Sequence, residues 1–121
     1  MKEITALMEY ADGDGDQPLA LCICRKGNFP DWETNVPDEV LYVPESALDS
    51  IDAGFREELG AQYYQDFELT GPLLERLKKS LSESLAKSSS EKVQVCVEGM
   101  AEFIKKAESM SDSHFLIFAG P

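Results

Sequence analysis

The chain has 121 residues, of which 43% are hydrophobic and 28% charged, a length and composition that suit one globular domain. Its 23 acidic residues outnumber 11 basic ones, so the formal net charge of −12 disfavours nucleic acid or an anionic membrane as a partner. The apolar runs are too short to cross a bilayer and the N-terminal residues lack the pattern of a signal peptide, so we expect a cytoplasmic protein.

The first predicted elements are two strands, residues 3–10 and 19–25, joined through the sequence ADGDGDQPL. Apolar residues occupy both faces of the second strand, which predicts an interior position in a sheet. Glycines between aspartates accept positive φ, and aspartates bond to their own backbone in turns. The connection therefore favours a hairpin turn between the two strands.

The alternate aspartates Asp12, Asp14 and Asp16 raise the alternative of a calcium loop. An EF-hand loop starting at Asp12 would need glycine at its sixth position and glutamate at its twelfth. This chain has Gln17 and Ile23 there. The hairpin is therefore favoured, and a weak metal site on the aspartates is the alternative.

Cys22, Cys24 and Cys96 are an odd number of cysteines in a chain without a secretion pattern. This predicts reduced thiols that are buried as small apolar residues. A zinc site usually needs four ligands, and His114 is the one histidine that could join the three thiols. Zinc is the less favoured alternative, and we expect His114 to be a structural or surface residue.

Residues 26–38 contain two prolines and no periodicity, which predicts a long loop carrying the only tryptophan, Trp32. A short strand at 39–43 and a helix over 45–59, ended by Gly60, should follow. The acidic side chains of this helix lack the basic complement that a solvated helix usually carries. Its apolar stripe has helical spacing and comprises Leu48, Ile51, Phe55 and Leu59.

Two further helices are predicted at 73–87 and 89–109, both with oppositely charged pairs four residues apart. Ser88 and Glu91 resemble a capping box at the start of the second helix. Alternating valines leave a strand at 92–98 as the competing interpretation.

A final strand is predicted at 114–118, and its apolar character throughout favours a central position in the sheet. The order of the elements predicts an α+β fold over a single domain, residues 1–121. In this domain a small, mostly antiparallel sheet should pack against about three helices. Such a fold by itself carries no function.

The charge imbalance is confined to one part of the chain. Residues 1–70 hold sixteen acidic and four basic residues, whereas residues 71–121 hold seven of each. Between 31 and 68, eleven acids accompany a single base and are interleaved with aromatic residues. We expect them to form one negative face that binds a basic protein partner. The residues assigned to this face are Asp31, Trp32, Glu33, Asp38, Glu39, Glu45, Asp49, Asp52, Glu57, Tyr63, Tyr64, Asp66 and Glu68.

In size, acidity and lack of catalytic motifs the chain resembles the small cytosolic immunity proteins of bacterial toxin systems. The likeness lies in the acidic stretch with Trp32, Asp49, Asp52, Tyr63 and Tyr64. It implies a protein that neutralises a basic nuclease-type toxin by capping its active or substrate-binding surface. A DNA-mimic inhibitor and a non-catalytic adaptor or regulatory subunit are the alternatives. We expect neither catalysis nor a cofactor, because carboxylates are the only candidate catalytic groups.

Overall fold

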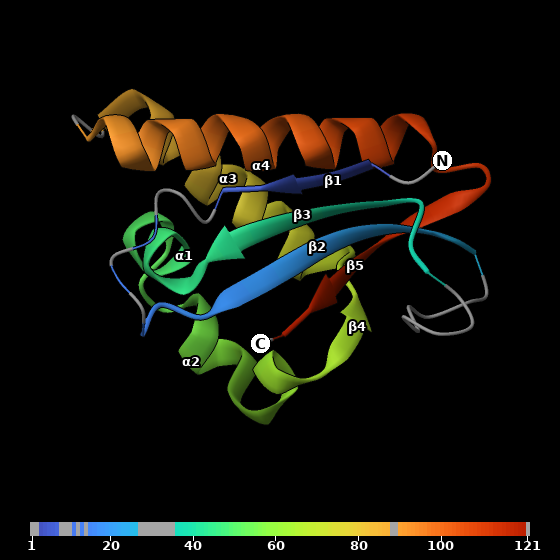
Figure 1. Ribbon diagram of the computed structural model, residues 1–121, viewed down its shortest axis with the longest axis horizontal. Coiled ribbons are helices and arrows are strands. Elements are labelled where there is room, and N and C mark those ends of the chain that lie inside the picture. The colour runs from blue at the N-terminus through green and yellow to red at the C-terminus, as the bar shows by residue number, and fades with distance from the viewer. Residues whose placement is uncertain are drawn as a thin grey trace.

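The computed structural model of the chain describes residues 3–7, 11, 13, 15–26, 36–87 and 90–120. Its strands and helices form an α+β domain with one mostly antiparallel sheet, which confirms the predicted fold class (Figure 1). In chain order the elements are β1 (Glu3–Ala6), β2 (Pro18–Arg25), β3 (Glu39–Pro44), α1 (Glu45–Ile51), α2 (Phe55–Leu59), the 3-10 helix η2 (Gly60–Tyr64), β4 (Asp66–Glu68), α3 (Gly71–Lys87), α4 (Glu91–Ser109) and β5 (His114–Ala119).

In the described part of the chain the sheet has five strands, in the order β1-β3-β2-β5-β4. β2 lies at the centre and pairs antiparallel with both β3 and β5. β4 pairs antiparallel with β5, whereas β1 runs parallel to β3. The prediction that residues 19–25 form an interior strand is confirmed. The final strand, predicted to be central, is an interior strand next to the central β2.

The predicted hairpin between the first two strands is wrong, because β3 lies between β1 and β2 in the sheet. A tight turn is present, since Gly13 has a φ of 129° and its carbonyl accepts the Asp16 N–H at 3.1 Å. The Asp16 carboxylate then caps α1. Its Oδ1 accepts the Ser46 N–H at 3.0 Å and its Oδ2 accepts the Ser46 hydroxyl at 2.5 Å. Asp16 is thus held at the start of α1, which directly follows β3.

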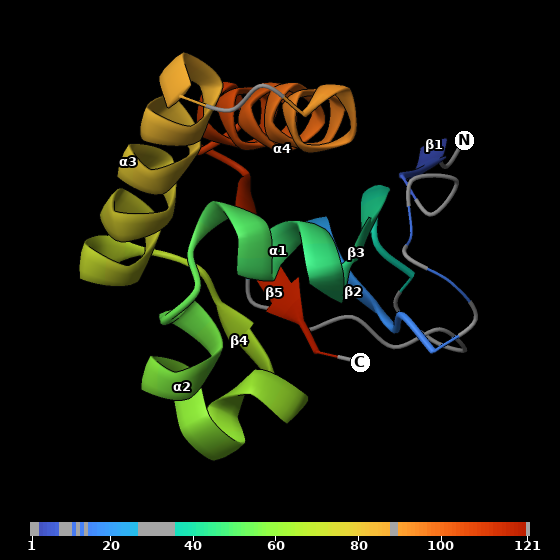
Figure 2. The ribbon, with the colours of Figure 1, turned by 90° about the vertical axis from the view of Figure 1, so that its left-hand side faces the viewer.

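The main core lies between one face of the sheet and the helices, with α1, α3 and α4 on that face (Figure 2). Leu19, Leu21 and Ile23 of β2 point into it, because alternate residues of a strand face the same side. The intervening residues Ala20, Cys22 and Cys24 form a smaller apolar cluster on the second face of the sheet.

The three cysteines are buried free thiols, as predicted. Burial raises the thiol pKa of Cys22 to about 12 and that of Cys24 to about 11. Burial also raises the pKa of Cys96, which belongs to the main core. All three side chains pack among apolar residues of the two clusters.

The helix predicted over 45–59 is interrupted. α1 ends at Ile51, α2 begins at Phe55, and Gly60 with a φ of 58° leads into η2. The Asp52 N–H still donates to the Leu48 carbonyl at 2.8 Å, and the Phe55 N–H donates to the Asp52 carbonyl at 3.2 Å across a short turn that separates the two helices. The predicted apolar stripe is nevertheless confirmed, since all four of its members are buried.

α3 and α4 correspond to the two later helices of the prediction. The N-cap of α4 is Ser90, whose hydroxyl accepts the Val93 N–H at 3.4 Å, so the predicted capping box is misplaced. Ser88 lies outside the described residues. Because α4 covers 92–98, the alternative of a strand there is excluded. Among the described residues, no helix combines the length and the apolarity needed to cross a membrane.

Replacing Asp16 by alanine removes both acceptors at the start of α1. We expect Asp16→Ala to lower the free energy of unfolding by about 1 kcal/mol. Asp16→Asn keeps an acceptor for the Ser46 amide and should cost less. Urea unfolding followed by circular dichroism measures both, and equal stability of Asp16→Ala and the wild type would contradict the capping role.

Candidate functional site

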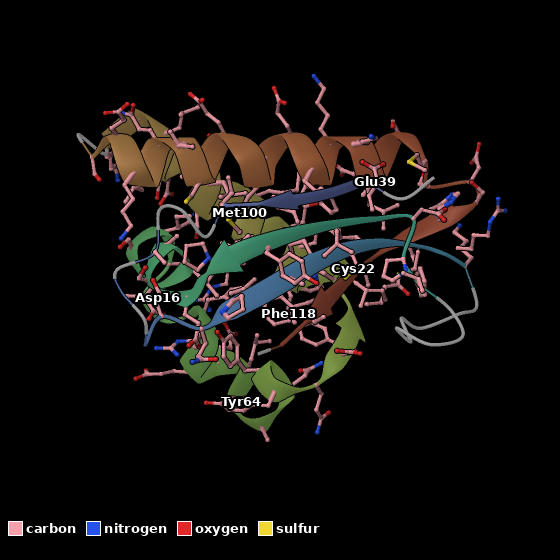
Figure 3. The ribbon with its side chains drawn as sticks, in the orientation of Figure 1. Asp16, Cys22, Glu39, Tyr64, Met100 and Phe118 are labelled. Carbon is pink, nitrogen blue, oxygen red and sulfur yellow. The ribbon has the colours of Figure 1, made fainter. Side chains whose placement is uncertain are left out.

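Among the described residues, those predicted to form one negative face lie in separate parts of the molecule. Asp38 and Glu39 stand at the start of β3, and Glu45 follows its other end, about 20 Å away for a strand of six residues. Figure 3 shows that Glu39 also lies far from Tyr64. The largest group belongs to α1, α2, η2 and their connection: Glu45, Asp49, Asp52, Glu57, Tyr63 and Tyr64.

A further pair, Asp66 and Glu68, lies on the edge strand β4. Phe67 between them packs into the main core, so the two acidic side chains point toward the second face of the sheet. The described residues therefore do not form the single face that the sequence led us to expect. The remaining members of the prediction, Asp31, Trp32 and Glu33, lie outside the described residues.

The guanidinium of Arg56 holds two carboxylates of α1. Its Nε and Nη2 donate to the two carboxylate oxygens of Asp49, both at 2.8 Å, and its Nη1 donates to Glu45 Oε2 at 2.9 Å. The buried Tyr63 hydroxyl donates to the same Glu45 oxygen at 2.5 Å. Burial and this carboxylate raise the pKa of Tyr63, which keeps the hydroxyl protonated. Arg56 also lies over the Tyr63 ring, 5.5 Å from its centroid.

Arg76 of α3 makes a second clamp on the connection between α1 and α2. Its Nε and Nη2 donate to the carboxylate of Asp52, both at 2.8 Å, and its Nη1 pairs with Glu58. The Ser80 hydroxyl donates to Asp52 at 2.9 Å. The hydrogen bond from Arg76 is the largest cause that lowers the pKa of Asp52.

These two clamps correct the expectation that the acids of the first helix lack a basic complement. The complement comes from Arg56 in the next helix and from Arg76, which lies 24 residues from Asp52 in sequence. Sequence reasoning missed Arg76 because it belongs to a segment whose charges balance locally. The surplus of acids in the first helix was the signal for Arg76, because partly buried carboxylates need cations from other segments as partners.

The clamps leave a surplus of negative charge. Residues 45–68 and Arg76 carry seven carboxylates and two guanidinium groups, which gives a net charge of −5. Tyr64 lies beside these groups with 67% of its surface exposed, and its ring packs edge-on against Tyr63 at 5.1 Å. We use the term Tyr64 surface for the exposed part of α1, α2, their connection and η2. It comprises Asp49, Ala53, Arg56, Glu57, Gly60 and Tyr64.

The acids at the other end of β3 are bound to the C-terminal half of the chain. Glu39 pairs with Lys106 at 2.6 Å, and Asp38 accepts from His114 Nε2 at 2.6 Å. The Ser113 hydroxyl lies 2.6 Å from Nδ1 of the same histidine. His114 is thus a buried structural residue that joins β5 to the start of β3, consistent with the structural role expected of it.

The Ser113, His114 and Asp38 side chains have the residue types of a hydrolytic triad. Acyl transfer also needs donors for the developing oxyanion beside the nucleophile. The backbone N–H groups of Ser113 and His114 both donate to the Met110 carbonyl, at 3.1 and 2.9 Å. They are therefore committed to the turn before β5, and we assign no catalytic role to this array.

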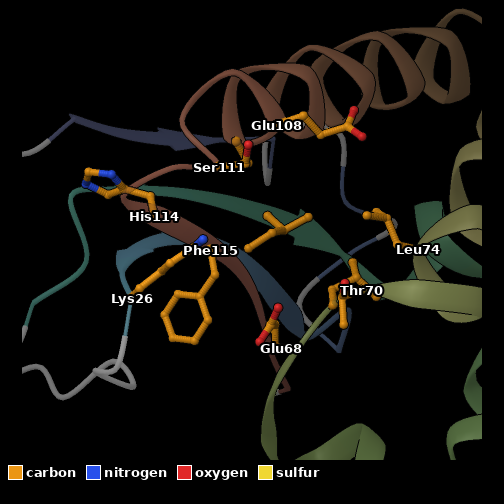
Figure 4. Close-up of a pocket in the computed structure, with 11 residues that line it drawn as sticks. Lys26, Glu68, Thr70, Leu74, Glu108, Ser111, His114 and Phe115 are labelled. Carbon is orange, nitrogen blue, oxygen red and sulfur yellow. The ribbon is translucent and has the colours of Figure 1, made fainter.

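A small cavity lies between β4, β5 and the end of α4 (Figure 4). Its volume of about 180 Å³ is below the roughly 300 Å³ at which sites for small molecules usually begin. Lys26, Glu68 and His114 contribute polar groups to its wall, and both ring nitrogens of His114 are already hydrogen-bonded. The histidine thus offers no free nitrogen to a ligand in the cavity.

Metal ligands do not converge within the described ranges, since no three histidine, cysteine or acidic side chains come together there as a metal site. Asp12 and Asp14 lie outside those ranges, so the calcium alternative stays a prediction.

Comparison of the chain with protein-family models, with curated proteins and with solved structures gives no match.

The adjacent tyrosines provide a matched pair of variants. Tyr63→Phe removes a buried donor from Glu45 and should lower the free energy of unfolding by about 1 to 2 kcal/mol. Tyr64→Phe changes an exposed side chain and should shift it by less than about 0.5 kcal/mol. Urea unfolding of both variants tests this difference, and equal effects would argue against the Tyr63–Glu45 bond.

Asp52 makes the stabilising effect of the Arg76 clamp depend on pH. The pKa of Asp52 is lowered in the folded state. Its contribution to the free energy of unfolding is therefore present above the unfolded pKa of about 4 and is lost as the pH falls through the folded pKa. Asp52→Asn should therefore be less stable than the wild type at pH 7, and the difference should shrink below about pH 4. Thermal unfolding from neutral to acidic pH measures it, and a difference independent of pH would contradict the clamp.

Proposed function

We propose that the chain is a non-catalytic binding protein that uses the Tyr64 surface to bind a basic protein partner. The observation that carries this proposal is the net charge of −5 that residues 45–68 keep after Arg56 and Arg76 are counted. A surplus of negative charge speeds association with an oppositely charged protein and opposes association with nucleic acid.

The exposed ring of Tyr64 supports the same proposal. Tyrosine is enriched among the residues that dominate binding energy at protein interfaces, because it buries a large apolar area and keeps a polar group. The ring of Tyr63 packs edge-on against the Tyr64 ring, and the Tyr63 hydroxyl donates to Glu45, which holds Tyr63 in place. The anchor is therefore ordered before a partner arrives, which lowers the entropy cost of binding.

The predicted site residues divide into contacts and supports under this proposal. Glu57 and Tyr64 are candidates for direct contact, and Asp66 and Glu68 extend the negative potential along the edge of the sheet. The supports are the buried or clamped side chains Glu45, Asp49, Asp52 and Tyr63. Asp38 and Glu39, at the far end of β3, are left out of the interface.

Among basic partners, we propose a nuclease-type toxin, and for this chain the role of an immunity protein. A nuclease must present a cationic surface to its nucleic-acid substrate, and a protein that covers this surface with carboxylates blocks the substrate. Such a protein would act in the cytoplasm, where the free thiols of Cys22, Cys24 and Cys96 stay reduced.

The test uses the protein encoded beside this gene in its host, which the proposal requires to be a basic toxin-like domain. Co-expression should restore growth of cells that produce it. With an inactive form of that domain, the association rate should fall about tenfold or more as NaCl rises from about 50 to about 500 mM. Glu57→Lys should slow association at least about twofold.

Glu98→Lys is the matched control, because it makes the same charge change at an exposed position of α4. Equal rates for Glu57→Lys and Glu98→Lys, or a rate that does not respond to salt, would contradict the proposal. Such a result would favour an adaptor or regulatory subunit whose acidity serves solubility.

A further inference from the structure

We propose that the Tyr64 surface contains a subsite for one arginine or lysine side chain of the partner, an inference that rests on the proposed function and specifies its contact. The subsite is an open hollow of about 460 Å³ between α2 and η2. It is lined by Asp49, Ala53, Arg56, Glu57, Gly60, Tyr63 and Tyr64.

Small residues keep the hollow open. Ala53 carries only a methyl group, and Gly60 has a φ of 58°, a conformation that side chains rarely adopt. A Cβ built at Gly60 would meet nothing within 4 Å. The hollow therefore has room for a side chain that comes from outside the molecule.

The aromatic wall of the hollow favours a cation. Cations bind over the faces of aromatic rings, and the protein already uses this contact between Arg56 and Tyr63. Tyr64 contacts Tyr63 at an interplanar angle of 83°, and 67% of its surface is exposed. An incoming guanidinium could stack on this ring, and its alkyl stem could cover the apolar part of the wall.

The charges of the wall favour the same occupant. Arg56 uses its Nε, Nη1 and Nη2 to donate to Asp49 and Glu45, so its own charge is already compensated. Glu57 adds an exposed carboxylate on the same hollow. The hollow thus combines the Tyr64 ring, the Glu57 carboxylate and the space beside Gly60. This combination suits a cation on an alkyl stem better than a bare metal ion, which prefers several oxygen ligands.

The experiment is an NMR titration of the 15N-labelled protein with N-acetyl-arginine amide. Its control is the amide of N-acetyl-citrulline, a neutral molecule of nearly the same shape. We expect the arginine derivative to shift the amide signals of Ala53, Gly60 and Tyr64 with millimolar affinity. The citrulline derivative should bind at least about threefold more weakly.

Tyr64→Ala and Glu57→Gln should each weaken the arginine derivative about two- to fourfold, and Glu98→Gln on α4 should leave its affinity unchanged. Tyr64 and Glu57 are exposed, so both variants should keep the fold, which their NMR spectra report directly. Shifts spread over acidic residues throughout the molecule, or equal binding of both derivatives, would overturn the subsite.

The subsite and the proposed function fail in different ways. Salt-dependent association with the basic domain but no local shifts with the arginine derivative would overturn the subsite and leave the binding function in place. Local shifts without association with the basic domain would support a cation subsite and contradict the proposed partner.

Discussion

The arrangement of α1, α2 and η2 depends on two guanidinium groups, each shared between two carboxylates. Arg56 joins Glu45 to Asp49, and Arg76 joins Asp52 to Glu58. Without them, four carboxylates in a short stretch would repel one another. The bidentate contacts with Asp49 and Asp52 also fix orientation, because two parallel N–H···O bonds align the planar guanidinium with the carboxylate. Arg76 thereby ties the connection between α1 and α2 to α3.

The same clamps decide which acids are available for binding. Clamped side chains such as Asp52 cannot turn toward a partner without breaking contacts, whereas Glu57 and Tyr64 face solvent. Two cations do not neutralise seven acids, so a negative potential persists over an ordered surface. Rigid support, surplus charge and an exposed aromatic ring thus coincide at one end of the molecule.

Local patterns predicted most of the secondary structure. The apolar runs of β2 and β5 and the helical periods of α3 and α4 need only neighbouring residues to be recognised. Contacts between segments far apart in the chain could not be predicted in this way. The pairing of β1 with β3, the contact of Arg76 with Asp52 and that of His114 with Asp38 join segments far apart in the chain. The acidic site was predicted as a face because composition gives the amount of charge and not its position.

A double-mutant cycle tests most directly whether the Arg56 clamp organises the acidic surface. The cycle combines Arg56→Met with Asp49→Asn and measures the free energy of unfolding of both single variants and the double variant. The clamp predicts a coupling energy of about 0.5 to 1 kcal/mol for this partly exposed bidentate pair, reduced at high salt. Additive effects of the two substitutions, with no coupling at low salt, would contradict the claim.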